Sequence, residues 1–389
     1  MLNMKRLEER IIRHRRELHR NAEVGFDLPI TKAYVQNILS ELGIKSESVG
    51  KCGVVATLGN DKNKCVLLRA DMDALPIKEE LCLEFSSQNG NMHACGHDMH
   101  TAMLLGAAEI LKSRESELYG TVKLMFQPAE ETLEGALDMI NKGVLESPRV
   151  DAAFMLHVVP SENLPIGSVI VSGGGLSAPS ADFFKIFVEG KSSHGANPQA
   201  GIDALAVGAR IALGTTDIVT MEIPTTESAV LSIGSFIAGD SANTIAGNAE
   251  LSGTFRCFDE SIREKIRIRL EEIADNTARA YRARARVEYT SGTPALKNSG
   301  ALSEFANNSL KSAFGDMSVY SSGELGMESN IGGSEDFAYV SERVDALMLG
   351  IVATNNIRCA LHNPKTEFSE KCLLPGSIAY ATLAIDYLK

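Results

Sequence analysis

The feature that most constrains this chain is a regular alternation of short apolar runs and helical stretches before Ser180. Three apolar runs predict buried strands, at residues 65–70, 122–126 and 152–156. Helical periodicity appears at residues 101–111 and 134–142. Strands that alternate with helices indicate an α/β fold whose sheet is covered by helices on both faces.

The order of elements changes between about Asp182 and Tyr289. A strand, a helix, two strands, a long helix and a final strand follow one another, which is the ferredoxin-like order of a small two-layer domain. A later apolar run at 346–352 predicts another strand of the first sheet. We therefore predict a discontinuous, mixed-sheet catalytic domain of residues 1–180 and 293–389, with residues 181–292 inserted as an α+β domain.

Composition and charge exclude several classes of protein. The chain has 389 residues, with 38 Lys plus Arg against 50 Asp plus Glu and a formal net charge of −12, which disfavours nucleic-acid binding. No stretch approaches the roughly 18 apolar residues of a membrane helix, and the amino terminus lacks a signal-peptide core. Seven cysteines without a framework spacing favour the reducing cytoplasm.

Polar side chains cluster where the predicted strands end. Ligands of open α/β sheets bind beyond the carboxyl ends of the strands. The sequence places one cysteine with several histidines and carboxylates next to those ends or in the HACGHDMH segment, which precedes the helix predicted at 101–111. These residues are Asp71, Asp73, Cys95, His97, Glu130, Glu131, His157 and His362. A thiolate with imidazoles and carboxylates at one sheet edge predicts a transition-metal site.

The Cys95–His97 pair and the Glu130–Glu131 pair are each weak evidence for a metal site alone, and stronger evidence together. Cys95 and His97 are two residues apart, so an extended loop would point both side chains to one side. Adjacent Glu130 and Glu131 suggest that one carboxylate binds metal while the other takes a proton from water. The alternative is a pair of solvated loop charges, which Pro128 disfavours because proline fixes the loop before them.

Six segments occur in an order typical of a known family. They are RRELHRNAEVGF (15–26), LLRADMDALPI (67–77), NMHACGHDMHTAMLLGAA (91–108), FQPAEE (126–131), SSHGANP (192–198) and GGSEDFAYV (332–340). Together they resemble metallopeptidase family 20, subfamily D, which includes aminoacylases, hippurate hydrolases and hydrolases of indole-acetyl-amino-acid conjugates. The resemblance implies a metal-dependent amidohydrolase acting on small N-acyl amino acids. A dipeptidase or carboxypeptidase is the alternative, and a noncatalytic metal-binding protein is a third reading.

The resemblance also implies roles for single residues. Two divalent metal ions, with Zn or Mn in first place and Co or Ni as alternatives, would be held by Cys95, His97, Glu131, His157 and His362. Glu130 would be the general acid and base. The inserted domain resembles the family's lid and dimerisation domain, where His194 would bind the oxyanion, and Asn243 and Arg256 the substrate carboxylate. The expected protein is a cytoplasmic homodimer.

Other polar residues keep more than one reading. His14 and His19, near the start of the chain, are expected to serve packing or the surface rather than a metal. His93 and His100 are expected to hydrogen-bond around the ligands. Asp73 and Asp98 could each orient a ligand imidazole or cap the following helix.

Overall fold

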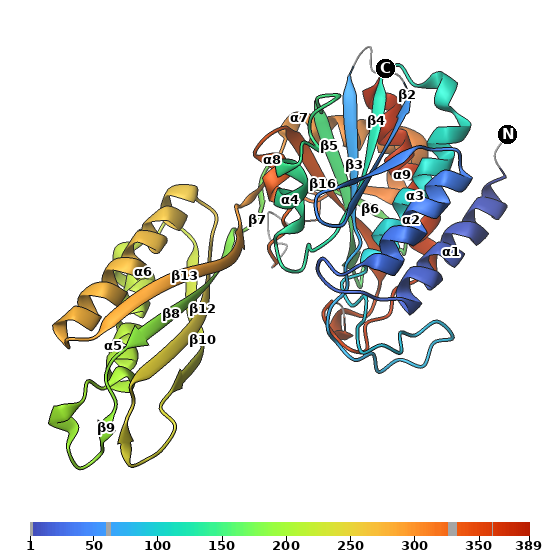
Figure 1. Ribbon diagram of the computed structural model, residues 1–389. Helices are drawn as coiled ribbons and strands as arrows, with labels where there is room; N and C mark the ends of the chain where they lie inside the picture. Colours follow the sequence, from blue (N-terminus) through green and yellow to red (C-terminus); the bar gives the residue numbers. More distant parts are fainter. Residues whose placement is uncertain (1–2, 60–63, 326–332, 360) are drawn as a thin grey trace. The chain divides into compact units, whose positions relative to one another are not determined.

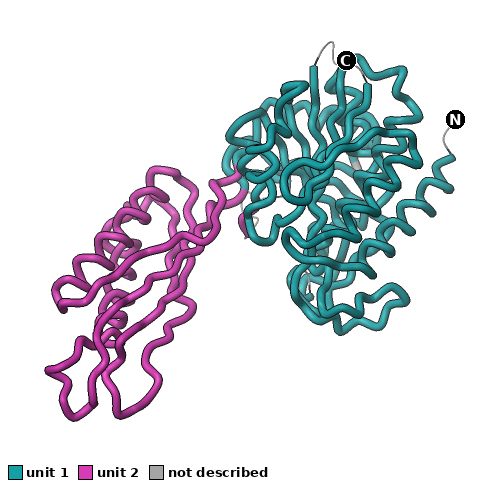
Figure 2. Tube along the Cα trace, in the orientation of Figure 1, with its two compact units in different colours: residues 1–177, 297–330, 336–389 teal, residues 178–296, 331–335 magenta. Residues whose placement is uncertain are grey.

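The computed structural model describes residues 3–59, 64–325, 333–359 and 361–389, so Gly332 of the GGSEDFAYV segment lies outside the described residues. The chain divides into two compact units, which Figure 2 colours separately. The larger unit comprises Met1–Ser177, Lys297–Asn330 and Asp336–Lys389, and the smaller unit comprises Ala178–Leu296 and Ile331–Glu335. Strands β7 (Gly175–Ala178) and β14 (Leu296–Asn298) carry the chain into and out of the smaller unit.

The larger unit is built on an eight-stranded mixed sheet in the order β1-β2-β4-β3-β5-β16-β6-β15 (Figure 1). Its strands are β1 (Ser46–Val49), β2 (Gly53–Gly59), β3 (Cys65–Asp71), β4 (Thr121–Gln127), β5 (Ala152–Pro160), β6 (Val169–Val171), β15 (Val319–Ser321) and β16 (Asp345–Thr354). Strands β4, β3, β5 and β16 are mutually parallel, whereas β2 and β6 run antiparallel to them. The mixed sheet confirms the predicted α/β fold class.

Helices cover both faces of this sheet. One face packs its alternate residues, such as Val66 and Leu68, into a single core with α1 (Met4–Arg20), α2 (Pro29–Glu41), α3 (His97–Ser113), α7 (Gly300–Phe314) and α9 (Leu373–Tyr387). Helix α1 does so because its apolar residues recur at helical spacing, as at Leu7, Ile11 and Leu18. The opposite face contacts α4 (Gly135–Asn141) and α8 (Ala338–Ser341).

The smaller unit has a four-stranded antiparallel sheet in the order β10-β12-β8-β13. Its elements follow as β8 (Ala181–Glu189), α5 (Ala204–Asp217), β10 (Ala229–Ala238), β12 (Asn248–Cys257), α6 (Glu260–Ala280) and β13 (Arg284–Thr293). This is the predicted ferredoxin-like order. The unit has its own core, in which Ile186 and Leu251 of the sheet pack with Ile211 of α5 and Ile266 of α6.

Helix α5 corrects the expectation that no stretch of the chain approaches the apolar length of a membrane helix. Together with η3 (Ile218–Glu222) it forms a 19-residue stretch, Ala204–Glu222, long and apolar enough by length and composition alone to cross a membrane. Such a stretch is weak evidence of a span, and the inward face of this one packs Val207, Ile211 and Ile218 into the core. Its outward face carries Leu213, which is 71% exposed.

Candidate metal centre

Five side chains with metal-binding atoms meet beside the carboxyl ends of the parallel strands. They are Cys95 in the turn before α3, His97 at the start of α3, Glu131 after β4, His157 in β5 and His362 after β16, and all lie in the larger unit. The donor atoms of Cys95, His97 and His157 lie within 4.8 Å of one another, and so do those of Cys95, Glu131 and His362. Cys95 belongs to both groups, so the two groups would hold two metal ions side by side with Cys95 as a shared residue.

The conformation around Cys95 differs from the extended loop that the C-x-H spacing suggested. That prediction is wrong, because Gly96 adopts a left-handed conformation (φ 83°) and α3 begins at His97. A Cβ atom at position 96 would lie 2.4 Å from Val158 Cγ2. Glycine is therefore required here both by its φ angle and by the close approach of β5.

Hydrogen bonds at Nδ1 fix the tautomers of His97 and His157. His97 Nδ1 lies 2.8 Å from the backbone oxygen of Asp73, and His157 Nδ1 lies 2.7 Å from that of Val158. A carbonyl oxygen only accepts, so each Nδ1 carries a hydrogen, and Nε2 is the nitrogen that can bind metal once it is deprotonated. His157 and His97 thus both offer Nε2 as a metal ligand.

His100 is arranged differently and supports the site without binding metal. Its Nδ1 donates to Asp71 Oδ1 at 2.6 Å, and its Nε2 accepts from the backbone N–H of Val158 at 2.9 Å. Both ring nitrogens are used, as expected of a residue that hydrogen-bonds around the ligands. Asp71 and His100 together link β3, α3 and β5.

Asp73 orients the glutamate pair and does not cap a helix. Its Oδ1 accepts from the backbone N–H of Glu130 at 3.0 Å and its Oδ2 from that of Glu131 at 3.2 Å. Its backbone oxygen also holds His97. Glu131 Oε1 lies 3.4 Å from His362 Nε2, and Glu130 Oε2 lies 3.8 Å from His97 Nε2. One aspartate therefore positions both the imidazole and the carboxylates.

The unpaired atoms of the cluster fit a cation. Within the described ranges, His97 Nε2 and Glu131 Oε1 are buried and make no hydrogen bond. An unmatched buried polar atom costs about 1–3 kcal/mol, so such atoms at one place indicate a ligand. Sulfur, nitrogen and oxygen donors together suit a transition metal. The residues present therefore fit two divalent cations.

The electrostatics of the cluster favour positive charge. The neighbouring Cys95 sulfur and Glu131 carboxylate raise the pKa of His362 to about 10. Burial opposes the charge of His97, but the Asp71 carboxylate and the hydrogen bond to Asp73 keep the pKa of His97 well above its ordinary value. By contrast, burial and the neighbouring His100 lower the pKa of His157 to about 3. Protons and divalent cations compete for such nitrogens, so metal affinity falls with decreasing pH.

A second buried polar cluster lies behind the start of α3. Asp98 accepts from Arg15 Nε at 2.9 Å and contacts His19 Nδ1 at 2.8 Å, so it anchors α1 and does not orient a ligand. His19 is 2% exposed and has a packing role. His93 is buried but, within the described residues, its ring nitrogens make no hydrogen bond, unlike the prediction.

The three predicted residues of the smaller unit lie at its two ends. His194 in β9 (Ser193–His194) pairs with Thr244 of β11 (Thr244–Ile245), and Gly195 N donates to Asn243 O at 2.7 Å. His194 and Asn243 therefore share one tip of the unit, near the β9 label in Figure 1. Arg256 lies near the end of β12, beside Cys257, whose carbonyl accepts from Ser180 at the chain's entry into the unit. The structure thus separates Arg256 from the other two.

Sequence reasoning missed Arg69, which is fully buried in β3. Its guanidinium donates to Gln127 Oε1 at 2.9 Å, to Asp71 Oδ2 at 2.7 Å and to Asp336 Oδ1 at 2.9 Å. A charged residue inside an otherwise apolar strand was the available sign, because a buried charge needs partners.

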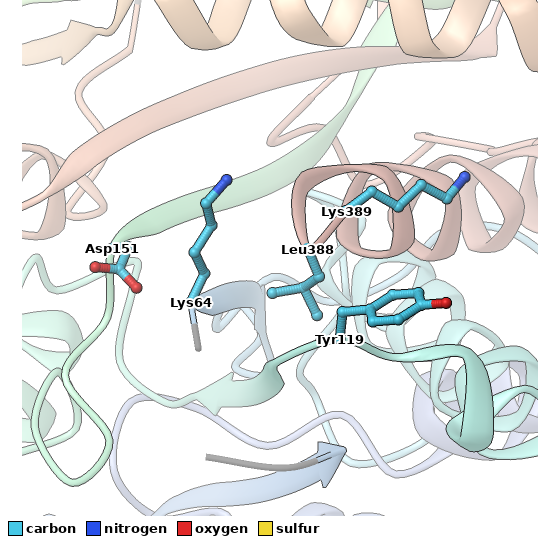
Figure 3. Close-up of a pocket in the computed structure, with 5 residues that line it drawn as sticks. All are labelled: Lys64, Tyr119, Asp151, Leu388 and Lys389. Carbon is cyan, nitrogen blue, oxygen red and sulfur yellow. The ribbon is translucent and has the colours of Figure 1, made fainter. Parts of the chain in front are cut away.

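A separate hollow of about 580 Å³ lies at the opposite edge of the sheet and is lined by Lys64, Tyr119, Asp151, Leu388 and Lys389 (Figure 3). Lys64, Tyr119 and Asp151 come just before β3, β4 and β5. They therefore mark the amino ends of the strands, whereas the metal donors lie toward the carboxyl ends. The hollow contributes nothing to the site.

Several known hydrolases are similar to this chain over nearly its whole length. Residues 67–386 match the model of peptidase family M20/M25/M40. The chain is 35% identical to N-acetylcysteine deacetylase of Bacillus subtilis (strain 168), over 99% of this chain and 98% of that protein. It is 34% identical to thermostable carboxypeptidase 2 of Saccharolobus solfataricus, over 99% and 97% respectively.

A solved structure extends the likeness to the fold. The Bacillus subtilis YXEP protein, described as a dinuclear metal binding peptidase from the M20 family, superposes with a TM-score of 0.78 at 33% identity, covering 99% of each chain. The family match covers most of the chain and includes the cysteine, the three histidines and the glutamate that meet at the sheet edge. The chain therefore belongs to peptidase family M20/M25/M40.

Proposed function

We propose that this protein is a two-metal amidohydrolase that cleaves the amide bond of N-acyl amino acids, giving a carboxylic acid and a free amino acid. The observation that carries the proposal is the sharing of Cys95 between two groups of donors, with a second glutamate beside them. The N-acetylcysteine deacetylase similar to this chain supports the substrate class. The family resemblance of the sequence points to the same reaction.

The metal ligands in this proposal are Cys95, His97, Glu131, His157 and His362. When bound, two divalent cations supply Lewis acidity, which polarises the amide carbonyl and makes water acidic enough to attack near neutral pH. Mixed sulfur, nitrogen and oxygen donors favour Zn or Mn, with Co or Ni as alternatives. A thiolate ligand also favours a reducing compartment, so we assign the protein to the cytoplasm.

Glu130 is the general base and acid of the proposed reaction. Its side chain is 8% exposed, its backbone is held by Asp73, and its carboxylate lies 3.8 Å from His97 Nε2. From this position Glu130 can take a proton from the attacking water and return it to the departing amine. Its nearly complete burial keeps bulk water from competing for that proton.

The smaller unit supplies the groups that recognise substrate. In this proposal residues 1–180 and 293–389 form the catalytic domain and residues 181–292 the lid and dimerisation domain. His194 is exposed and donates to the developing oxyanion, while Asn243 and Arg256 bind the substrate carboxylate. Arg256 is eight residues along β12 from Asn248, a span of roughly 26 Å at about 3.3 Å per residue. One small carboxylate cannot touch both ends of that strand.

We infer a homodimer from the distance between Arg256 and the other two substrate-binding residues. If Arg256 comes from one copy, Asn243 and His194 must reach the same substrate from the other copy. Strand β10 lies at an edge of the four-stranded sheet and exposes Val230 and Ile237, the latter 68% accessible. An edge strand with exposed apolar residues pairs readily with a second copy.

A substrate panel tests the proposed reaction. Protein stripped with a chelator and reconstituted with zinc or manganese is assayed on N-acetyl amino acids, hippurate and dipeptides, with the stripped protein as control. We expect metal-dependent hydrolysis of the N-acyl amino acids. Faster cleavage of dipeptides would favour the dipeptidase or carboxypeptidase alternative, to which the similar carboxypeptidase points.

The Glu130→Gln variant separates catalysis from metal binding. We expect kcat to fall about 10²- to 10⁴-fold, because a general acid–base group is lost, with the metal content unchanged. Glu134→Gln is the matched control, since Glu134 is an exposed glutamate of the same loop. Loss of metal from Glu130→Gln would mean that the roles of the two glutamates are exchanged. Full metal content without cleavage by the parent would favour a binding protein.

A further inference from the structure

The GGSEDFAYV segment contains none of the residues to which the proposed reaction gives a role. Its Asp336 belongs to the larger unit and is fully buried. The Asp336 carboxylate contacts residues on both sides of the loop between β4 and α4, which carries Glu130 and Glu131. We define this glutamate loop as residues Pro128–Glu134.

Asp336 clamps the two ends of the glutamate loop. Its Oδ1 lies 2.7 Å from Gln127 Nε2 and its Oδ2 lies 2.9 Å from the same nitrogen. Its Oδ2 also accepts from the backbone N–H of Ala136 at 2.8 Å. Gln127 is the last residue of β4 and Ala136 is the second residue of α4. A single carboxylate therefore joins the residue before the loop to the first turn of the helix after it.

Arg69 ties this clamp to the rest of the site. Arg69 Nη2 donates to Asp336 Oδ1 at 2.9 Å, and Arg69 Nη1 donates to Asp71 Oδ2 at 2.7 Å. Asp71 in turn holds His100. The guanidinium thus connects the clamp of the glutamate loop to the residues that support the histidine ligands.

The glutamate loop needs such a clamp because its backbone is strained. Ala129 and Leu133, one on each side of the glutamate pair, both have left-handed conformations, with φ angles of 54° and 58°. Residues with a Cβ atom adopt this conformation only when their surroundings hold them there. The loop is also closed tightly, since a Cβ atom at Gly135 would lie 1.6 Å from Pro128 O.

We propose that Asp336 is a positioning residue that holds the glutamate loop in the conformation presenting Glu130 and Glu131 to the metal pair. Asp73 binds the middle of the loop and Asp336 binds its two ends. The contacts of Asp336 with Arg69, Gln127 and Ala136 are all with N–H donors, so a carboxylate is required and an amide would turn a donor toward donors. The inference rests on the proposed function for the roles of the two glutamates.

The test is a zinc titration of the chelator-stripped, full-length Asp336→Asn variant by calorimetry, followed by kinetics on the best substrate of the panel. We expect zinc affinity to weaken about 10- to 100-fold, the usual effect of losing a partner that orients a ligand. We expect kcat to fall while KM changes little, because the substrate carboxylate is bound by other residues. Gln127→Met removes one arm of the clamp and should weaken zinc binding in the same direction but less.

Asp182→Asn is the matched control. Asp182 is a fully buried aspartate that accepts from Arg263, and it belongs to the smaller unit, whereas the glutamate loop belongs to the larger one. Its variant should bind zinc as the parent does, whatever its thermal stability. Parental zinc affinity and kcat in folded Asp336→Asn would overturn the inference. If Asp336→Asn does not fold, parental zinc affinity in Gln127→Met would overturn it equally.

The zinc readout also separates this inference from the proposed function. If the parent binds two zinc ions but hydrolyses nothing, and Asp336→Asn binds zinc more weakly, the positioning role stands and the reaction assignment fails. If the parent is active and Asp336→Asn matches it in zinc affinity and kcat, the reaction assignment stands and the positioning role fails.

Discussion

The two units of this protein differ in how many ionisable side chains they bury. The larger unit buries many of them, including Arg15, Arg69, Asp71, Asp98 and Lys123, each with partners. In the smaller unit, between Ala178 and Leu296, the buried charged residues are Asp182 and Arg263, and the predicted functional residue His194 is exposed. Side chains that hold metals need fixed geometry, whereas groups that meet substrate must remain accessible.

In the smaller unit, the largest loss of activity should come from substitution of His194, its exposed imidazole. His194→Ala should lower kcat about 10²- to 10³-fold, because an oxyanion donor is lost, and should leave metal content unchanged. Single-turnover kinetics with metal analysis would measure both. His194→Gln keeps a donor and should recover part of the rate. An unchanged rate in His194→Ala would remove the smaller unit from the chemistry.

A mixing experiment locates the action of His194. Neither Glu130→Gln nor His194→Ala should be active alone, but a mixed dimer would contain one intact site if His194 acts across the dimer. Random reassociation should then restore about a quarter of the parental activity. No recovery in a preparation shown to contain mixed dimers would place His194 in its own subunit's site.

The next effect is a loss of stability, and two variants should show it in different units. Lys123 is buried in β4 and its Nζ donates to three backbone carbonyls, those of Val144, Glu146 and Pro148. Lys123→Met leaves these acceptors without their donor, and we expect a loss of about 3 kcal/mol in the larger unit. Asp182→Asn leaves Arg263 with a weakened partner and should destabilise the smaller unit.

Differential scanning calorimetry can assign these losses. If the units unfold independently, Lys123→Met lowers one transition and Asp182→Asn lowers the other. A single transition that moves equally in both variants would contradict the independence of the two cores.

The smallest effect is a pH dependence of the free energy of unfolding of the larger unit. Burial, with the charges of Arg13 and Arg10, lowers the pKa of His14 from 6.5 to about 4. The unfolded chain therefore binds this proton more readily, so the contribution of His14 to stability is present above about pH 6.5 and is lost as pH falls toward 4. Urea unfolding at pH 7 and pH 5 should show a loss on the order of 1 kcal/mol that His14→Gln lacks. The same loss in the variant would exclude His14 as its source.

Long periodic segments of the fold could be predicted from sequence. The predicted runs at 65–70, 122–126, 152–156 and 346–352 fall within β3, β4, β5 and β16, since buried parallel strands are continuously apolar. Strands β6 and β15 have three residues each, too few to show a period, and they exist because neighbouring strands pair with them. Their presence depends on tertiary structure.

The proximity of the candidate donor side chains could be predicted from the sequence, whereas the hydrogen bonds that support them could not. Residue types near strand ends and before α3 were enough to single out Cys95, Glu131 and His157 as candidate donors. The tautomer of His97 depends on a backbone carbonyl at Asp73, and no pattern of side chains encodes that contact. The role of Asp336 was hidden for a similar reason, because its partners lie about 200 residues earlier in the chain.

The central place of β16 has a consequence for synthesis. This strand lies between β5 and β6 in the sheet, but in the chain it comes after the inserted unit Ala178–Leu296. A ribosome releases Ala178–Leu296, a unit with its own core, well before it releases β16. The inserted domain can therefore fold while the sheet still lacks a neighbour along β5, and this gap closes only after β16 has been synthesised. During that interval the nascent chain presents an unpaired apolar edge to chaperones or to neighbouring chains.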